Sequence, residues 1–141
     1  MLRTLLLVLA ITQVSEVSQS YLVMQPIQEA VQHGRFSALG PICRPRISLN
    51  LEEPFSLSGF VTQEEFIKEF SARLANLAID KLEWSSLQVE ENIAVQSLNL
   101  LLSDRFSGFT IYYKLILFMS AETNPAKETE WKLYYLRGLK I

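Results

Sequence analysis

The chain has 141 residues, of which 49% are hydrophobic and 20% are charged, with a formal net charge of −2 at pH 7. This composition is typical of a packed globular domain and excludes a disordered chain. A phosphate-binding surface needs a basic excess, so we expect no nucleic-acid partner. One cysteine cannot form an internal disulfide bond, so the core alone must hold the fold together.

The first 20 residues have the three-part pattern of a secretory signal. A single positive charge at Arg3 precedes the apolar run Leu5–Ile11, and a polar stretch of small residues follows. The apolar run is far shorter than the roughly 18 to 20 residues of a membrane-spanning helix. We therefore expect a signal peptide over residues 1–20, cleavage near Tyr21, and export as a soluble protein to the periplasm or beyond. The alternative is that this run forms an apolar first helix or strand of the fold.

Residues 21–141 are predicted to form a single domain. No Gly/Ser-rich linker, low-complexity tract or internal repeat divides them. A domain of this size buries about two thirds of its unfolded surface, which is enough for a core without cross-links. The only cysteine, Cys43, lies well beyond the leader, so no thiol stands at the cleavage point to carry a lipid anchor.

The first half of the domain is predicted to be mainly helical. A helix is expected over about Tyr21–His33, with Gly34 as its natural stop. A short helix or turn follows over residues 36–42. The segment Arg46–Glu52 then alternates between apolar and polar residues, which indicates a strand with one wet side.

The strongest local signal is the capping box Thr62-Gln63-Glu64-Glu65, in which Thr62 caps a helix and Glu65 reaches back to the cap amide. The helix is expected to run to about Leu77 or Ala78. Phe66, Phe70, Leu74 and Leu77 recur at helical spacing and form its apolar stripe. We therefore expect this helix to lie across a sheet and to supply much of the core.

Four strands are predicted after this helix, at about residues 81–89, 93–102, 109–119 and 130–140. The third is about eleven residues long, twice the usual length, which predicts strong bending or twisting. Within residues 93–102 the apolar positions change parity, and such a change is typical of a β-bulge. The expected fold class is α+β, with helices packed on one strongly curved antiparallel sheet.

This order of elements resembles the nuclear-transport-factor-2-like superfamily of cystatin-like cones, and most closely a small exported bacterial domain of unknown function. The segments that carry the resemblance are Ile27–Gly34, Leu39, Ile47–Leu49, Thr62–Phe70, Thr110–Leu115 and Trp131–Leu136. The resemblance covers nearly all of residues 21–141, through patterns of apolar residues and helix caps. It implies that helices close one side of a curved sheet to make a cone.

The chemically active residue types do not assemble into a recognisable active site. The only histidine, His33, lies at a predicted helix end, where a cation interacts favourably with the helix dipole. With one histidine and one cysteine, the chain offers neither a transition-metal site nor a Cys–His nucleophile pair. The carboxylate pairs at 52–53, 64–65 and 90–91 suit a strand end, a first helical turn and a hairpin turn. We therefore expect no enzyme, no cofactor and no metal.

The remaining signal is an aromatic and apolar surface on the second face of the sheet. Alternate residues of a strand share a face, so two neighbouring strands build this surface together. Its predicted members are Tyr112, Lys114, Ile116, Phe118, Lys132, Tyr134 and Leu136. Because exposed apolar patches usually mark an interface, we predict a non-enzymatic interaction module that forms a homodimer or binds an envelope protein. The same residues can also form cross-strand pairs that lysine stems partly cover.

A carrier of a small apolar ligand is the alternative function. Its ligand would lie inside the cone, between the helix over 62–78 and the sheet. The predicted lining residues are Phe66, Phe70, Trp84, Phe109 and Trp131. Bulky rings favour a filled cone, although aromatic side chains also line apolar pockets. The sequence therefore leaves both functions open.

Overall fold

The computed structural model describes residues 25–123 and 125–141, so the predicted signal peptide over residues 1–20 lies outside the described residues. Its helical segments are residues 25–33, η1 (Phe36–Ile42) and α2 (Gln63–Leu74). Its strands are β1 (Cys43–Leu51), β2 (Leu57–Thr62), β3 (Leu77–Trp84), β4 (Gln88–Glu90), β5 (Ile93–Asp104), β6 (Thr110–Thr123) and β7 (Thr129–Lys140). The predicted sequence of helices followed by long strands is confirmed.

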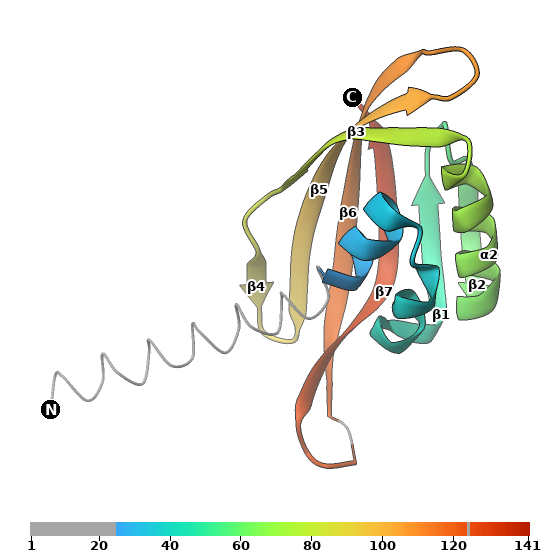
Figure 1. The fold of residues 1–141 in the computed structure, drawn as a ribbon. Coiled ribbons are helices and arrows are strands. Elements are labelled where there is room, and N and C mark those ends of the chain that lie inside the picture. The colour runs from blue at the N-terminus through green and yellow to red at the C-terminus, as the bar shows by residue number, and fades with distance from the viewer. Residues whose placement is uncertain (1–24, 124) are drawn as a thin grey trace, which may run out of the picture.

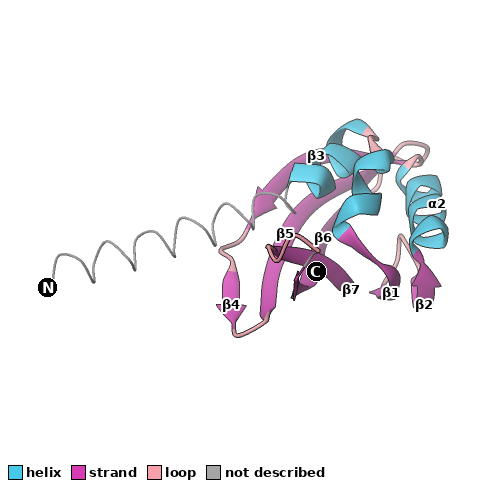
Figure 2. Ribbon diagram, turned by 90° about the horizontal axis from the view of Figure 1, so that it is seen from below, coloured by secondary structure: helices cyan, strands magenta, loops and turns pink. Residues whose placement is uncertain are grey.

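The described strands form one curved sheet in the order β2-β1-β7-β6-β5-β3, and β4 also pairs with β5. The helices lie inside the curve, as Figures 1 and 2 show, so they cover one face only. The predicted α+β cone is therefore confirmed, with one difference. The sheet is mixed, because β7 runs parallel to β1 while the other neighbouring strands are antiparallel.

Local signals explain where the helices begin and end. The Thr62 side chain accepts a hydrogen bond from the backbone N–H of Glu65 at 3.2 Å, as the capping box predicts. Gly34 has a positive φ of 67°, and its N–H donates to the Ala30 carbonyl, which caps the helix over 25–33. The α2 helix ends at Leu74, earlier than predicted, because the following residues start an edge strand of the sheet.

The strands differ from the predictions in three details. The strand expected over 81–89 is divided into β3 and β4, which both pair with β5. The edge strand β2, which pairs with β1, was not predicted, since Gly59 interrupts its apolar pattern. The β-bulge expected in residues 93–102 is absent from the β5–β6 ladder, whose register is continuous. The apparent change of parity arises because Gln96 occupies an inward position, where its amide donates to the Ser85 carbonyl at 2.9 Å.

Aromatic rings fill the space between α2 and the sheet. Phe66 stacks on Phe70 with ring centroids 5.3 Å apart, and Phe70 stacks on Phe55 at 5.2 Å. Phe55 in turn meets the Tyr113 ring edge-to-face at 5.0 Å. The Tyr113 hydroxyl donates to the Glu52 carbonyl at 2.9 Å, so the one polar atom of this cluster is satisfied. This cluster joins α2 to the middle of the sheet.

Candidate functional site

The uncovered face of the sheet carries three rows of side chains across β5, β6 and β7. One row is Val95, Phe118 and Tyr135, and the next contains Ile116 beside Arg137. The third row contains Lys114 beside Leu139, and Tyr112 lies beyond it at 62% exposure. We call these residues the outer patch, defined as Val95, Tyr112, Lys114, Ile116, Phe118, Tyr135, Arg137 and Leu139. Most of them are half-buried by their neighbours and face away from the helices.

The structure corrects one predicted member of this surface. Leu136 is only 2% exposed and lies in the core. The reason is a β-bulge at Tyr134, since Phe118 pairs with Tyr135 whereas the next residue of β6 pairs with Leu133. The extra residue reverses the parity of β7, so Tyr135 and Leu139 face outward instead. Alternation within a single strand gives no signal for such a bulge.

The other predicted β7 residues lie at the charged end of the face. The Tyr134 ring packs under the Arg44 guanidinium, which lies 5.7 Å from the ring centroid. Arg44 Nε also lies 2.7 Å from a carboxylate oxygen of Glu122. Lys132 is half-buried, and its ammonium donates to the Pro41 carbonyl. These contacts make Tyr134 and Lys132 part of a polar border beside the outer patch.

The five predicted pocket-lining aromatics do not surround a common cavity. Phe66 and Phe70 belong to the stacked core, and both are almost fully buried. Trp84 and Trp131 are half-buried against the edges of the core. Phe109 is 74% exposed in the loop before β6, because that loop extends past the end of α2 (Figure 1). The described part of the cone is therefore filled between α2 and the sheet.

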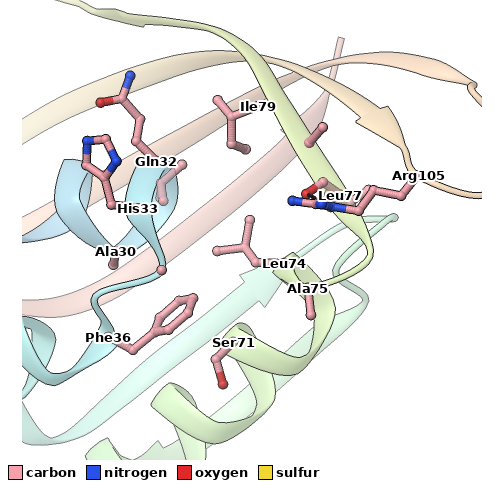
Figure 3. A pocket seen from close by; sticks show the side chains of 13 residues that line it. Ala30, Gln32, His33, Phe36, Ser71, Leu74, Ala75, Leu77, Ile79 and Arg105 are labelled. Atoms are coloured by element: carbon pink, nitrogen blue, oxygen red, sulfur yellow. Dashed lines mark hydrogen bonds between the residues drawn. The ribbon is translucent and has the colours of Figure 1, made fainter.

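A cavity of about 630 Å³ lies elsewhere, between the C-terminal end of helix 25–33, the C-terminal end of α2 and the start of β3. Figure 3 shows His33 and Arg105 on opposite sides of it, with Leu74 and Ile79 between them. Leu74 is buried and Ile79 is half-buried, whereas His33 and Arg105 are exposed. Sequence reasoning missed this cavity, because its walls come from the ends of separate elements.

The described residues contain neither a metal-ligand cluster nor a helix that could span a membrane. No group of three or more His, Cys, Asp or Glu side chains there is arranged to hold a metal ion. None of the helices described is long and apolar enough to cross a membrane.

Cys43 is expected to resist alkylation in the folded protein. Its side chain is 3% exposed, and burial raises the pKa of the thiol to about 12, against a smaller lowering by Lys132. Only the thiolate reacts, and at pH 8 a pKa of about 12 leaves roughly one thiol in 10⁴ ionised. Iodoacetamide labelling followed by mass spectrometry should show modification in urea and almost none in buffer. Rapid labelling of the folded chain would contradict the burial of this thiol.

The same pKa shift fixes the direction of the pH dependence of stability. The folded chain holds the Cys43 proton more tightly than the unfolded chain, whose thiol has a pKa near 8.5. The stabilisation is therefore complete below about pH 8.5 and is lost as pH rises toward 12. Burial also raises the pKa of Tyr113, which adds to the loss in strong alkali.

Comparison with known proteins supports the class of fold that this geometry defines. No family model matches the chain, and no curated protein matches its sequence. Solved structures do match, and they show that the chain has the NTF2-like cone fold. A DUF4783 family protein from Bacteroides uniformis ATCC 8492 superposes with a TM-score of 0.64 and 10% identity, over 83% of this chain and 95% of its own.

Two further structures give the same result. A DUF4783 family protein from Bacteroides ovatus ATCC 8483 has a TM-score of 0.63 and 11% identity, over 82% of this chain and 93% of its own. An NTF2-like protein of unknown function from Silicibacter pomeroyi DSS-3 has a TM-score of 0.63 and 14% identity, over 92% of this chain and 98% of its own. At this identity the likeness concerns the fold alone.

Proposed function

We propose that this chain is an exported, non-enzymatic domain that acts as an interaction module, and that its first partner is a second copy of itself. The observation that carries the proposal is the outer patch. Its one fully apolar row, Val95, Phe118 and Tyr135, extends over three neighbouring strands of the face that the helices leave uncovered, and Ile116 and Leu139 lie in the next two rows. Packing this face against another protein would remove the patch from water, which is the usual role of such a surface.

The charges on β6 favour a second copy as the partner. Lys114 and Glu122 lie four residues before and after Phe118, so all three side chains share the outward parity of the strand. A twofold axis near Phe118 would stack two copies of β6 in opposite directions. Such an axis places Lys114 of each copy opposite Glu122 of the other, where Lys114 would add a second cation beside the carboxylate that Arg44 already contacts, so the interface is self-complementary.

Replacing Ile116 with glutamate is expected to convert the dimer to a monomer without unfolding the domain. Ile116 is half-buried in the middle of the outer patch, and removing a new carboxylate from water there on association costs several kcal/mol, which the neighbouring Arg137 offsets only in part. Native mass spectrometry of the protein recovered from its own host measures the assembly. Tyr134→Glu is a weaker probe, because Tyr134 lies outside the outer patch, at the polar border beside Arg44. Lys68→Glu is the control, since Lys68 is exposed on α2, away from the sheet face.

A dimer for the unaltered chain and Lys68→Glu, with a monomer for Ile116→Glu, supports the interface. An unchanged dimer in Ile116→Glu contradicts it. A monomer that carries a reproducible small-molecule adduct would favour the second candidate, a ligand carrier. The same spectrum tests the proposed leader and the domain over 21–141. The mass of a chain that begins near Tyr21 supports export, whereas the full-length mass opposes it.

A further inference from the structure

The cavity at the ends of the helices has an apolar floor. Its volume of about 630 Å³ falls within the roughly 300 to 1,000 Å³ of small-molecule sites. Val31, Leu74 and Leu77 are buried in its walls, and Phe36 and Ile79 are half-buried there. An alkyl chain or a ring that lies on this floor would be removed from water together with it.

Arg105 supplies the polar part of the cavity. Its Nε–H donates to the Leu77 carbonyl at 3.1 Å, and its backbone N–H donates to the Asn76 carbonyl at 3.0 Å. These two bonds hold the guanidinium at the rim, where Figure 3 shows it beside Leu77. Its terminal nitrogens form no hydrogen bond or ion pair with any described residue. They therefore remain available as a two-nitrogen fork, the geometry that matches a carboxylate.

The surroundings of the cavity favour an anion. Among the described residues that line it there is no Asp or Glu, and His33 and Arg105 are its titratable side chains. Helix C-terminal ends carry partial negative charge, which would oppose an anion. Here that charge is reduced, since Ala75 N–H donates to the Ser71 carbonyl and Gly34 N–H donates to an Ala30 carbonyl, both at 3.1 Å.

We propose that this cavity binds a small carboxylate with an apolar body, of the size of a medium-chain fatty acid. The alkyl part lies on the floor formed by Leu74, Leu77 and Ile79, and the carboxylate accepts hydrogen bonds from Arg105. The site is separate from the outer patch, which lies on the opposite face of the sheet. Ligand binding here and self-association there are therefore independent properties.

Octanoate and 1-octanol test the proposal as a matched pair, because they share the alkyl chain and differ in charge. Titration calorimetry of the full chain should give saturable octanoate binding with a Kd of about 1 mM or below, which suits a ligand of this size. Replacing Arg105 with methionine keeps an apolar stem but removes the fork. We expect this variant to bind octanoate about tenfold more weakly and 1-octanol unchanged.

Arg35→Met is the control variant, because Arg35 is an exposed arginine near the cavity that pairs with Glu29 and does not line it. It should bind octanoate like the unaltered chain. The proposal is overturned if octanoate does not saturate, or if it binds no more tightly than 1-octanol. It is also overturned if Arg105→Met leaves octanoate affinity unchanged. Should Arg105→Met fail to fold, Arg105→Lys provides the same test, since lysine keeps the charge and loses the fork. Native mass spectrometry measures self-association separately from octanoate binding.

Discussion

Replacing Gly138 with alanine is expected to lower the free energy of unfolding by about 3 kcal/mol. A Cβ atom at this position would lie 2.1 Å from the Tyr113 hydroxyl oxygen and 2.7 Å from the ring carbon Cε1. Tyr113 is fully buried and cannot swing away, because its hydroxyl donates to the Glu52 carbonyl and its ring packs on Phe55. Urea unfolding followed by far-UV circular dichroism measures the effect.

Gly40→Ala is the matched control for this substitution. The nearest atom to a Cβ atom at Gly40 is Oε1 of Gln63, at 3.8 Å, which is ordinary van der Waals contact. The control is expected to change the free energy of unfolding by less than about 0.5 kcal/mol. Adding Tyr113→Leu to Gly138→Ala should restore part of the lost stability, because it removes the atoms that clash. A Gly138→Ala variant as stable as Gly40→Ala would show that β7 and Tyr113 can separate freely.

Side-chain patterns within single elements were sufficient to predict the sheet and the capped helix. The long strands were predicted because apolar residues alternate along them, and Tyr113, Leu115, Leu117 and Met119 are indeed buried on one face. The capped helix was predicted because Thr62 and Glu65 form a local contact that depends on four consecutive residues. Signals of this kind lie within one element, so sequence alone was sufficient for the class of fold.

Features that depend on pairing between elements were not predictable in this way. The β-bulge at Tyr134 is defined by the register of β7 against β6. One extra residue there decides whether Leu136 faces the core or the outer patch. The inward position of Gln96 has the same origin, because its amide is satisfied by Ser85 from the neighbouring strand region. A polar residue in a hydrophobic alternation therefore implied a bulge that the ladder does not contain.

The cavity is a stronger case of the same limit. Leu74 and Leu77 were predicted as core residues of one helix, and Leu74, Leu77 and Ile79 do pack in or against the core. Their other sides form the cavity floor, because α2 and helix 25–33 end before they meet β3. Arg105 reaches this floor from a hairpin loop that follows β5. Convergence of chain ends has no periodic signature, so only the fold brings these residues together.

Replacing Phe70 with alanine is expected to lower the free energy of unfolding by about 4 kcal/mol, the largest effect of any substitution considered for this chain. Phe70 is 2% exposed and contacts three rings, with centroid distances of 5.3 Å to Phe66, 5.2 Å to Phe55 and 6.5 Å to Phe36. Its removal leaves a void between α2 and the sheet that the remaining rings cannot fill. Most of the 5 to 15 kcal/mol that is typical of a domain depends on such packing.

Phe109→Ala makes the same chemical deletion at a position that is 74% exposed. The sequence grouped Phe70 and Phe109 together as pocket-lining residues, whereas the fold separates them into a core residue and a surface residue. We therefore expect the free energy of unfolding of the Phe109 variant to lie within about 0.5 kcal/mol of that of the unaltered chain. Thermal and urea unfolding of both variants measure the difference. Equal losses would mean that Phe109 packs inside the domain, and a loss below about 1 kcal/mol for Phe70 would mean that the interior is loosely packed. A loose interior would provide room for an apolar ligand between α2 and the sheet, so this pair of variants also distinguishes a filled cone from an open one.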